Sequence, residues 1–288
     1  MKKIEAIVRK EKFDDIYKIL EKSGIGGLTN AKREIEGLTF SLTSPHLHKK
    51  WGTHPARGVL LYGPVGTGKT LLAKSLAHES QALFLQVRLS ILITKWPMET
   101  AEILPEIFSA VKTNGRIVLY FEELEALSVE RSPLPMEARA VGRRLTVLLG
   151  EGLDGLRPNA LALASTNFPD AIDPLLIEPG RFDRLIEVPL PEAEEKREII
   201  CLHKDRAEKS AGRPLFQSLD YDAILARMVR MSGADIAIII TRTLEEKVRL
   251  EGVGEKLDLV STGDIVKVIE EYRRTKEIIE KIRYGQYL

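Results

Sequence analysis

The hydrophobic positions along the chain follow two different patterns. Five short, mostly apolar runs with the character of β-strands can be recognised: Val59–Tyr62, Leu83–Val87, Ile117–Phe121, Leu161–Ala164 and Leu185–Val188. Segments with apolar residues at helical spacing separate them, for example Lys69–Ser80 and Thr100–Lys112. Continuous apolar strands that alternate with helices are typical of a parallel sheet buried on both faces. We therefore predict an α/β fold with a parallel five-stranded sheet between two layers of helices.

The pattern changes after Pro189 and Pro191. From Glu192 to the end, the chain is mostly charged amphipathic helix without a convincing strand. Such a change of character predicts a domain boundary near residue 190. We expect a short strand-helix extension at residues 1–24, an α/β domain at 25–190 and a smaller helical domain at 191–288.

The composition narrows the function classes. Lys and Arg number 43 against 42 Asp and Glu, so a net charge of +1 gives no electrostatic reason to expect nucleic acid or an anionic membrane as partner. No apolar run reaches the ~18 residues of a membrane span, and the N-terminus lacks the apolar segment of a signal peptide. The single cysteine, Cys201, excludes an internal disulfide, and we expect a reducing, cytoplasmic compartment.

A phosphate-binding motif lies at Gly63–Thr70, where GPVGTGKT fits the pattern G-x-x-x-x-G-K-[ST]. It follows a predicted strand and opens a predicted helix, which is the context the motif requires. Glycines let backbone amides face phosphate oxygens, and the helix N-terminus adds its positive dipole end. Lys69 would neutralise the outer phosphates and Thr70 would hold magnesium. The predicted phosphate-binding residues are Pro64, Val65, Gly66, Thr67, Gly68, Lys69, Thr70 and Leu71. The alternative is a glycine-rich turn with a chance lysine.

An acidic partner for this loop is expected at the end of another strand. In IVLYFEELEAL the apolar run leads into Glu122 and Glu123. One carboxylate would bind the magnesium shell and the other would polarise the attacking water. The alternative is a strand that ends in solvated acids, and the phosphate loop upstream favours the functional interpretation.

The order of these motifs resembles that of the AAA ATPases, in the branch of the AAA+ superfamily that includes katanin, spastin and the proteasomal ATPases. The similarity extends over about residues 24–275. It implies a P-loop NTPase αβα sandwich followed by a small α-helical lid domain. It also implies ATP and Mg²⁺ as cofactors and a homo-oligomeric, hexameric ring with active sites at the subunit interfaces.

The resemblance implies roles for several further residues. In IGGL, Ile25 and Gly26 match the segment that contacts adenine. Asn167, at the end of ASTN, matches the residue that senses the γ-phosphate. In the C-terminal domain, REIICLH places His203 near adenine and ribose. There, Gly233 and Ala234 of MSGADIAIII match a turn that faces the nucleotide.

Two residues depart from the family pattern. The magnesium-linked aspartate of the family is Glu122 here, one methylene longer, whereas Glu123 keeps the catalytic glutamate. Family members often carry two arginines that reach into the neighbouring subunit's site. In the segment IEPGR the first is Glu178, so only Arg181 remains. An arginine from a neighbour is worth about 10³-fold or more in rate in other P-loop enzymes. Slow hydrolysis, or dependence on a different partner subunit, is therefore an open alternative.

Residues 92–102, LITKWPMETAE, place a tryptophan after an apolar, strand-like run. Pro97 opposes regular structure at this point and predicts a loop. Trp96 either anchors the loop in the core or presents a gripping tip. The resemblance aligns Trp96 with the aromatic residue of the first pore loop, and Lys95 beside it. A tryptophan there would grip polypeptide without demanding a particular side chain.

These observations predict an ATP-hydrolysing ring motor that remodels or unfolds protein. One alternative is a slowly hydrolysing nucleotide-dependent switch or a partner-dependent ring subunit. Another is a nucleic-acid motor, which the near-neutral charge argues against. The tail Gln286–Leu288 carries Tyr287 where proteasomal ATPases have a docking tyrosine, but Gln286 does not fit, which favours a solvated tail over proteasome docking. The first 29 residues resemble the opening strand and helix of nitrogen-regulatory PII proteins, without an assigned role.

Overall fold

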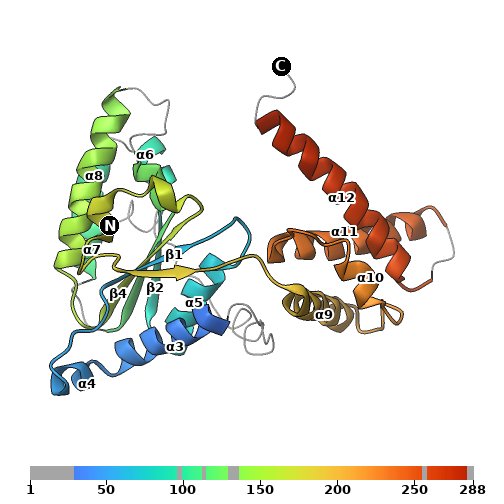
Figure 1. Ribbon diagram of the computed structural model, residues 1–288, viewed down its shortest axis with the longest axis horizontal. Coiled ribbons are helices and arrows are strands. Elements are labelled where there is room, and N and C mark those ends of the chain that lie inside the picture. The colour runs from blue at the N-terminus through green and yellow to red at the C-terminus, as the bar shows by residue number, and fades with distance from the viewer. Residues whose placement is uncertain (1–28, 96–98, 112–114, 129–135, 255–257, 284–288) are drawn as a thin grey trace. The chain divides into compact units, whose positions relative to one another are not determined.

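A computed structural model describes residues 29–95, 99–111, 115–128, 136–254 and 258–283 (Figure 1). The described residues up to Pro189 form one compact unit, and those from Leu190 onward form a second. The predicted N-terminal extension, Ile25, Gly26, Trp96 and the tail with Tyr287 lie outside the described residues, as does the side chain of Lys95. Predictions about them stay predictions.

The first unit is built on a five-stranded parallel sheet. Its strands are β1 (Gly58–Tyr62), β2 (Leu83–Arg88), β3 (Ile117–Glu122), β4 (Ala160–Thr166) and β5 (Arg184–Glu187). They are ordered β2-β3-β4-β1-β5, and every neighbouring pair is parallel. All five predicted strands are confirmed. Because the strands are parallel, their carboxyl ends share one edge of the sheet, which is where open α/β sheets bind ligands.

Helices cover both faces of this sheet, as predicted (Figure 1). One face packs on α5 (Lys69–Glu79), with α3 (Thr29–Thr43) beside it. The other face packs on α6 (Leu89–Lys95), α7 (Thr100–Ala110) and α8 (Met136–Asp154). Side chains along β3 point alternately to the two faces of the sheet. Leu119 and Phe121 pack in the core under α6–α8, whereas Tyr120 points to the α5 face. The remaining short helices are α4 (Pro45–Lys50) and three 3₁₀ turns, Leu124–Leu127, Pro169–Ala171 and Pro174–Ile177.

One interpretation made from the sequence was wrong. The apolar run before Trp96 was read as strand-like, but in the structure it forms the helix α6. Leu89, Leu92 and Ile93 are at most 8% exposed, and their i, i+3, i+4 spacing puts them on one helical face against the core. A short apolar run does not distinguish a buried strand from a buried helix, so packing decided the outcome.

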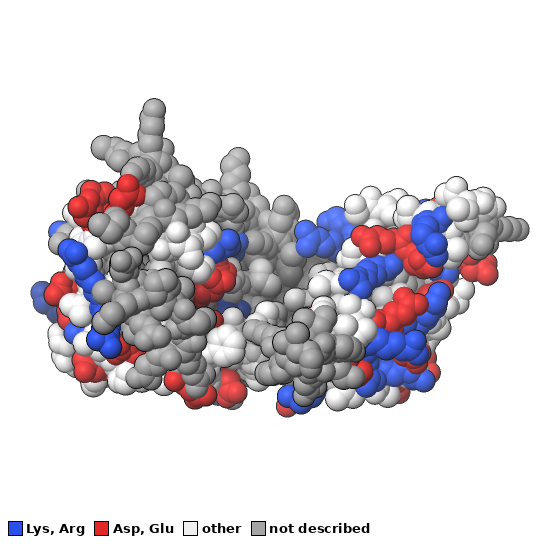
Figure 2. Space-filling view, turned by 90° about the horizontal axis from the view of Figure 1, so that it is seen from above, with Lys and Arg blue, Asp and Glu red and all other residues white. Residues whose placement is uncertain are grey.

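The second unit is helical, as predicted. Its helices are α9 (Ala193–Ala211), α10 (Tyr221–Leu225), α11 (Gly233–Gly252) and α12 (Thr262–Arg283), and within the described residues its only β pairing is the bridge Phe216–Val260. Isoleucines and methionines from all four elements or their flanks fill its core. Acidic and basic side chains are interspersed on the face of this unit that Figure 2 shows (right-hand part), and some of them form ion pairs. No helix in the described parts of either unit is long and apolar enough to cross a membrane.

Candidate nucleotide and active site

The loop between β1 and α5 is shaped by its glycines. Gly63, Gly66 and Gly68 have φ angles of +146°, +79° and +100°, a region that favours glycine. At Gly63 a side chain is also excluded by space, because a Cβ would lie 2.2 Å from the carbonyl oxygen of Val188. Gly68 is the N-cap of α5 and provides no capping side chain. The first N–H groups of α5 are therefore available to an anion at the positive end of the helix dipole.

Lys69 places a shielded cation in this loop. Its side chain folds back so that Nζ donates to the carbonyl oxygens of Gly63 and Pro64, each at 2.8 Å. The residue is 8% exposed, and burial lowers the pKa of its ammonium group to about 8, an effect that the nearby Glu125 carboxylate opposes. The amides of the loop and this ammonium form a site with the chemistry of a phosphate receptor.

Next to the loop, a set of polar residues on β2, β3, β4 and α5 forms what we call the Glu122 cluster. Its members are Thr70, Gln86, Arg88, Tyr120, Glu122 and Ser165. The Thr70 hydroxyl lies 3.0 Å from the Tyr120 hydroxyl and 3.4 Å from Oε1 of Glu122. Tyr120 in turn donates to Oγ of Ser165 at 2.7 Å. The buried phenol thus connects the hydroxyl of the loop to β4, and burial raises its pKa to about 12.

The other oxygen of Glu122 is also engaged. Gln86 Nε2 and Arg88 Nε both donate to Oε2 of Glu122, each at 2.9 Å. A hydroxyl and a carboxylate beside a phosphate site are the hard oxygen ligands that Mg²⁺ prefers. Thr70 and Glu122 therefore fit a magnesium ion shared with nucleotide phosphates, although Arg88 already neutralises the acid. Among the described residues, no group of three or more His, Cys, Asp or Glu could hold a metal on its own.

The second acid, Glu123, follows β3 in a left-handed conformation with φ +61°. Few residues other than glycine adopt this conformation, and it is typical of turns and functional sites. The chain then makes a 3₁₀ turn, Leu124–Leu127, which returns Glu125 to the same edge of the sheet.

Glu125 is a site residue that sequence reasoning missed. Its Oε1 accepts from the backbone N–H and from Nδ2 of Asn167, at 3.3 and 3.4 Å. Its Oε2 is buried and has no hydrogen-bond partner in the described part of the chain. The structure thus brings Asn167 to Glu125 and brings Glu125 close enough to Lys69 to affect its pKa. The available signal was the third acid in FEELEAL, one short turn after the first two.

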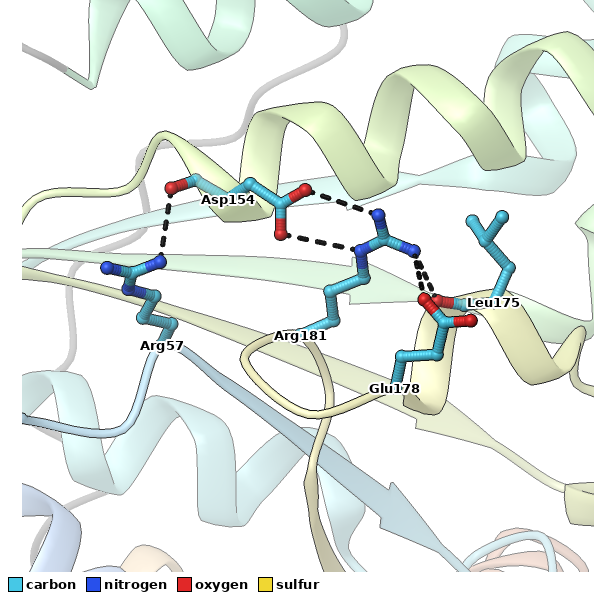
Figure 3. A network of polar contacts seen from close by, with 5 residues as sticks. All are labelled: Arg57, Asp154, Leu175, Glu178 and Arg181. Atoms are coloured by element: carbon cyan, nitrogen blue, oxygen red, sulfur yellow. Dashed lines mark hydrogen bonds and ion pairs between the residues drawn. The ribbon is translucent and has the colours of Figure 1, made fainter.

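Arg181 is the centre of a second polar network, drawn in Figure 3, which we call the Arg181 cluster. Nε and Nη2 donate to the two carboxylate oxygens of Asp154, at 3.4 and 3.2 Å. Nη1 donates to the carbonyl oxygen of Leu175 at 2.7 Å and to Glu178 at 3.0 Å. Arg57 completes the cluster by donating to the backbone carbonyl of Asp154 at 3.2 Å. The Asp154 and Glu178 carboxylates raise the pKa of Arg181.

Glycine spacing on α8 makes room for this guanidinium. Gly150 lies one turn before Asp154, and a Cβ there would approach Cζ of Arg181 to 3.1 Å. The side chain of Arg181 is 17% exposed, so contacts within its own chain hold it close to α8. Glu178, the departure from the family pattern noted above, is one of these contacts.

The remaining predicted residues lie in the second unit. His203 is on α9 and half-buried, and burial lowers its pKa. Gly233 begins α11, directly after Ser232, which caps the helix in a reciprocal pair of bonds with Asp235. Ala234 is exposed on the first turn of α11.

Comparison with known proteins finds one matching protein family and several similar proteins. The family described as "ATPase family associated with various cellular activities (AAA)" matches residues 59–190. A proteasome-activating nucleotidase of Methanothermobacter thermautotrophicus is 37% identical over 252 residues, which are 86% of this chain and 58% of the relative. That of Thermococcus onnurineus is 36% identical over 271 residues, 91% of this chain and 65% of the relative. That of Sulfurisphaera tokodaii is 35% identical over 274 residues, 92% of this chain and 67% of the relative. The chain thus spans 58–67% of the length of these three curated relatives.

Proposed function

The chain belongs to the AAA family of ATPases, and from this premise we propose that it hydrolyses ATP as a subunit of a homo-oligomeric, six-membered ring that unfolds or remodels protein. The observation that carries the proposal is the loop Gly63–Thr70, where free helix amides and the buried Lys69 adjoin Glu122 and the Glu125–Asn167 pair. In the cell, we place this activity in the cytoplasm.

In this proposal, residues 25–190 form the nucleotide-binding domain. Residues 64–71 bind the phosphates of ATP, and Thr70 with Glu122 would hold Mg²⁺, which would neutralise charge on the phosphate oxygens. Glu123 takes a proton from water as the water oxygen attacks the γ-phosphorus and the bond to ADP breaks. Asn167, oriented by Glu125, contacts the γ-phosphate.

The base and ribose complete the nucleotide site in this proposal. Ile25 and Gly26 contact adenine, and the lid domain, residues 191–288, contributes His203, Gly233 and Ala234. A neutral imidazole at His203 agrees with its lowered pKa, since the ring then offers both a donor and an acceptor at neutral pH.

The ring supplies the rest of the machinery. Arg181 acts on the ATP bound to the neighbouring subunit, and Trp96 with Lys95 grips the polypeptide. The relatives named above are proteasome-activating nucleotidases, which supports a proteasome-like protease as a partner, with Tyr287 in the docking tail.

Steady-state ATP hydrolysis measured against protein concentration tests this proposal. Specific activity should rise with concentration, because each site needs a neighbour. Glu123→Gln should bind ATP but lose hydrolysis by about 10²-fold or more, since the water is no longer polarised. Trp96→Ala should lose unfolding of a tagged fluorescent protein by a larger factor than it loses hydrolysis.

A nucleotide-dependent switch is the second candidate function. The engagement of Glu122 by Arg88 and of Arg181 by Glu178 favours it, because both contacts compete with the chemistry of hydrolysis. ATP binding without hydrolysis at any protein concentration would select the switch. Absence of nucleotide binding would contradict both functions.

A further inference from the structure

We propose that Arg88 acts as a resident positive charge on Glu122 and thereby weakens the dependence of nucleotide binding on Mg²⁺. The inference rests on the proposed function, because it concerns the same nucleotide site. Arg88 lies outside the phosphate loop and the acidic motif, but the register of the sheet brings its charge to Glu122.

The register of the sheet brings these two residues together. In the parallel β2–β3 ladder, Arg88 pairs with Glu122 and Gln86 pairs with Tyr120. Side chains alternate between the faces of a strand, so these four residues lie on one face, the face that α5 covers. The main-chain ladder therefore sets the positions from which Arg88 and Glu122 meet.

Hydrogen bonds from neighbouring side chains already occupy most of the acceptor sites of the Glu122 carboxylate. An ionised carboxylate offers about two acceptor sites on each oxygen. Oε2 receives Gln86 and Arg88, each at 2.9 Å, and Oε1 faces Thr70 at 3.4 Å. A magnesium ion or its bound water would compete with these donors. The extra methylene of glutamate over aspartate extends the reach of this carboxylate toward β2.

The charge of Arg88 is permanent under working conditions. Guanidinium groups stay protonated in proteins at any working pH, so the ion pair of Arg88 with Glu122 always carries this positive charge. Arg88 therefore offsets negative charge at the position where a divalent cation would otherwise do so. With Arg88 in place, the acids attract Mg²⁺ less, and the nucleotide phosphates meet a site that is already partly neutralised.

If Arg88 only stabilised the fold, its replacement would lower the stability of the protein. The side chain of Arg88 is 46% exposed, and ion pairs with such exposure contribute little to folding. Variants at position 88 should consequently fold, and their effect should be confined to the metal dependence of nucleotide binding.

The test is a titration of the full chain with a fluorescent ADP analogue, once with excess EDTA and once with excess Mg²⁺. The quantity of interest is the coupling factor, the dissociation constant in EDTA divided by that in Mg²⁺. Arg88→Met keeps the apolar stem and removes the charge, and should raise the coupling factor about fivefold or more over wild type. Arg88→Lys keeps the charge and should stay close to wild type.

Arg157→Met is the matched control. Arg157 is exposed in the turn before β4, at the opposite edge of the sheet from Glu122, and its removal should leave the coupling factor unchanged. Because coupling is reciprocal, the ratio of the Mg²⁺ dissociation constants without and with saturating ADP should change by the same factor in Arg88→Met. This second readout needs no hydrolysis.

The outcomes separate the inference from the proposed function. Equal coupling factors in wild type and Arg88→Met, with ADP bound in both, would overturn the inference and leave the nucleotide site intact. Loss of ADP binding by Arg88→Met under both conditions would also overturn it, because Arg88 would then be a structural residue. Failure of the wild type to bind the analogue at all would refute the proposed function and the inference together.

Discussion

The Glu122 cluster and the Arg181 cluster each pair an arginine with a carboxylate. They differ in which of the two side chains is the less exposed to solvent. In the Glu122 cluster the acid is the less exposed side chain, 20% against 46% for Arg88. In the Arg181 cluster the arginine is the less exposed one, 17% against 51% for Asp154 and 58% for Glu178. In both, the shielded residue is the one to which we assign a role at the ATP site, and its exposed partners modulate it.

The origin of the two clusters also differs. Strand register creates the first, because Arg88 and Glu122 are direct neighbours in the β2–β3 ladder. Chain geometry creates the second, where the end of α8, the turn Pro174–Ile177 and the loop before β5 meet at the guanidinium. A register is hard to change without refolding the sheet, whereas a loop contact can be broken locally. We therefore expect substitutions in the Arg181 cluster to act mainly on catalysis, and substitutions of the buried members of the Glu122 cluster, such as Tyr120, to act also on stability.

The largest expected effect tests whether Arg181 works outside its own chain. Arg181→Ala should reduce ATP hydrolysis about 10³-fold or more, because the neighbour's transition-state charge loses its partner. Steady-state hydrolysis at saturating protein concentration measures this, with the exposed Arg184→Ala as the matched control.

A mixing experiment distinguishes catalysis in trans from damage to the fold. Arg181→Ala subunits mixed with Lys69→Met subunits should regain activity, since sites then form between an intact loop and an intact Arg181. If mixing restores nothing, the contacts of Arg181 to Asp154 and Leu175 are its whole role, and the comparison between the clusters fails.

The next effect concerns stability within the Glu122 cluster. Tyr120→Phe keeps the ring that stacks on Phe84 but leaves the buried Ser165 hydroxyl without its donor. The free energy of unfolding should fall by about 1–3 kcal/mol, the cost of an unsatisfied buried polar group. Urea denaturation measures it, with Tyr62→Phe on β1 as control. A change as small as that of the control would show that the cluster contributes nothing to the fold.

A moderate gain is expected when the Arg181 cluster is returned to the family pattern. Glu178→Arg removes a carboxylate and adds a second cation, and should raise hydrolysis about tenfold, equivalent to ~1.4 kcal/mol of transition-state stabilisation. Glu178→Gln only removes the negative charge and should give a smaller increase. A decrease in both variants would indicate that Glu178 holds Arg181 in its productive position.

The smallest effect is a pH dependence that belongs to neither cluster. Burial lowers the pKa of His203 below 6.5, so the unfolded chain binds a proton more readily than the folded one. Stability should therefore fall as pH drops below about 6.5, because the proton then binds preferentially to the unfolded chain. Thermal unfolding of wild type and His203→Gln between pH 7 and 5.5 measures it, and the variant should lose this slope. If His203→Gln kept the slope of stability against pH, the slope would come from carboxylates, including those of the two clusters, and not from His203.

Local pattern was enough to predict much of the first unit. The five strands, the flanking helices and the phosphate loop follow from residues close together in sequence: apolar runs, helical spacing, and glycines before Lys69 and Thr70. Local pattern failed at Leu89–Lys95, where a short apolar run satisfies strand and helix equally and packing chose the helix. The positions of Trp96, Ile25 and Gly26 lie outside the described residues.

The sequence by itself determined the sheet, the phosphate loop and the order of the family's motifs, because each is encoded in one continuous stretch of chain. Only the tertiary structure decided which side chains meet. Arg88 reaches Glu122 across 34 residues, Asp154 reaches Arg181 across 27, and Glu125 reaches Asn167 across 42. Such pairs depend on strand order, register and the paths of loops, and no periodicity within a segment reports them.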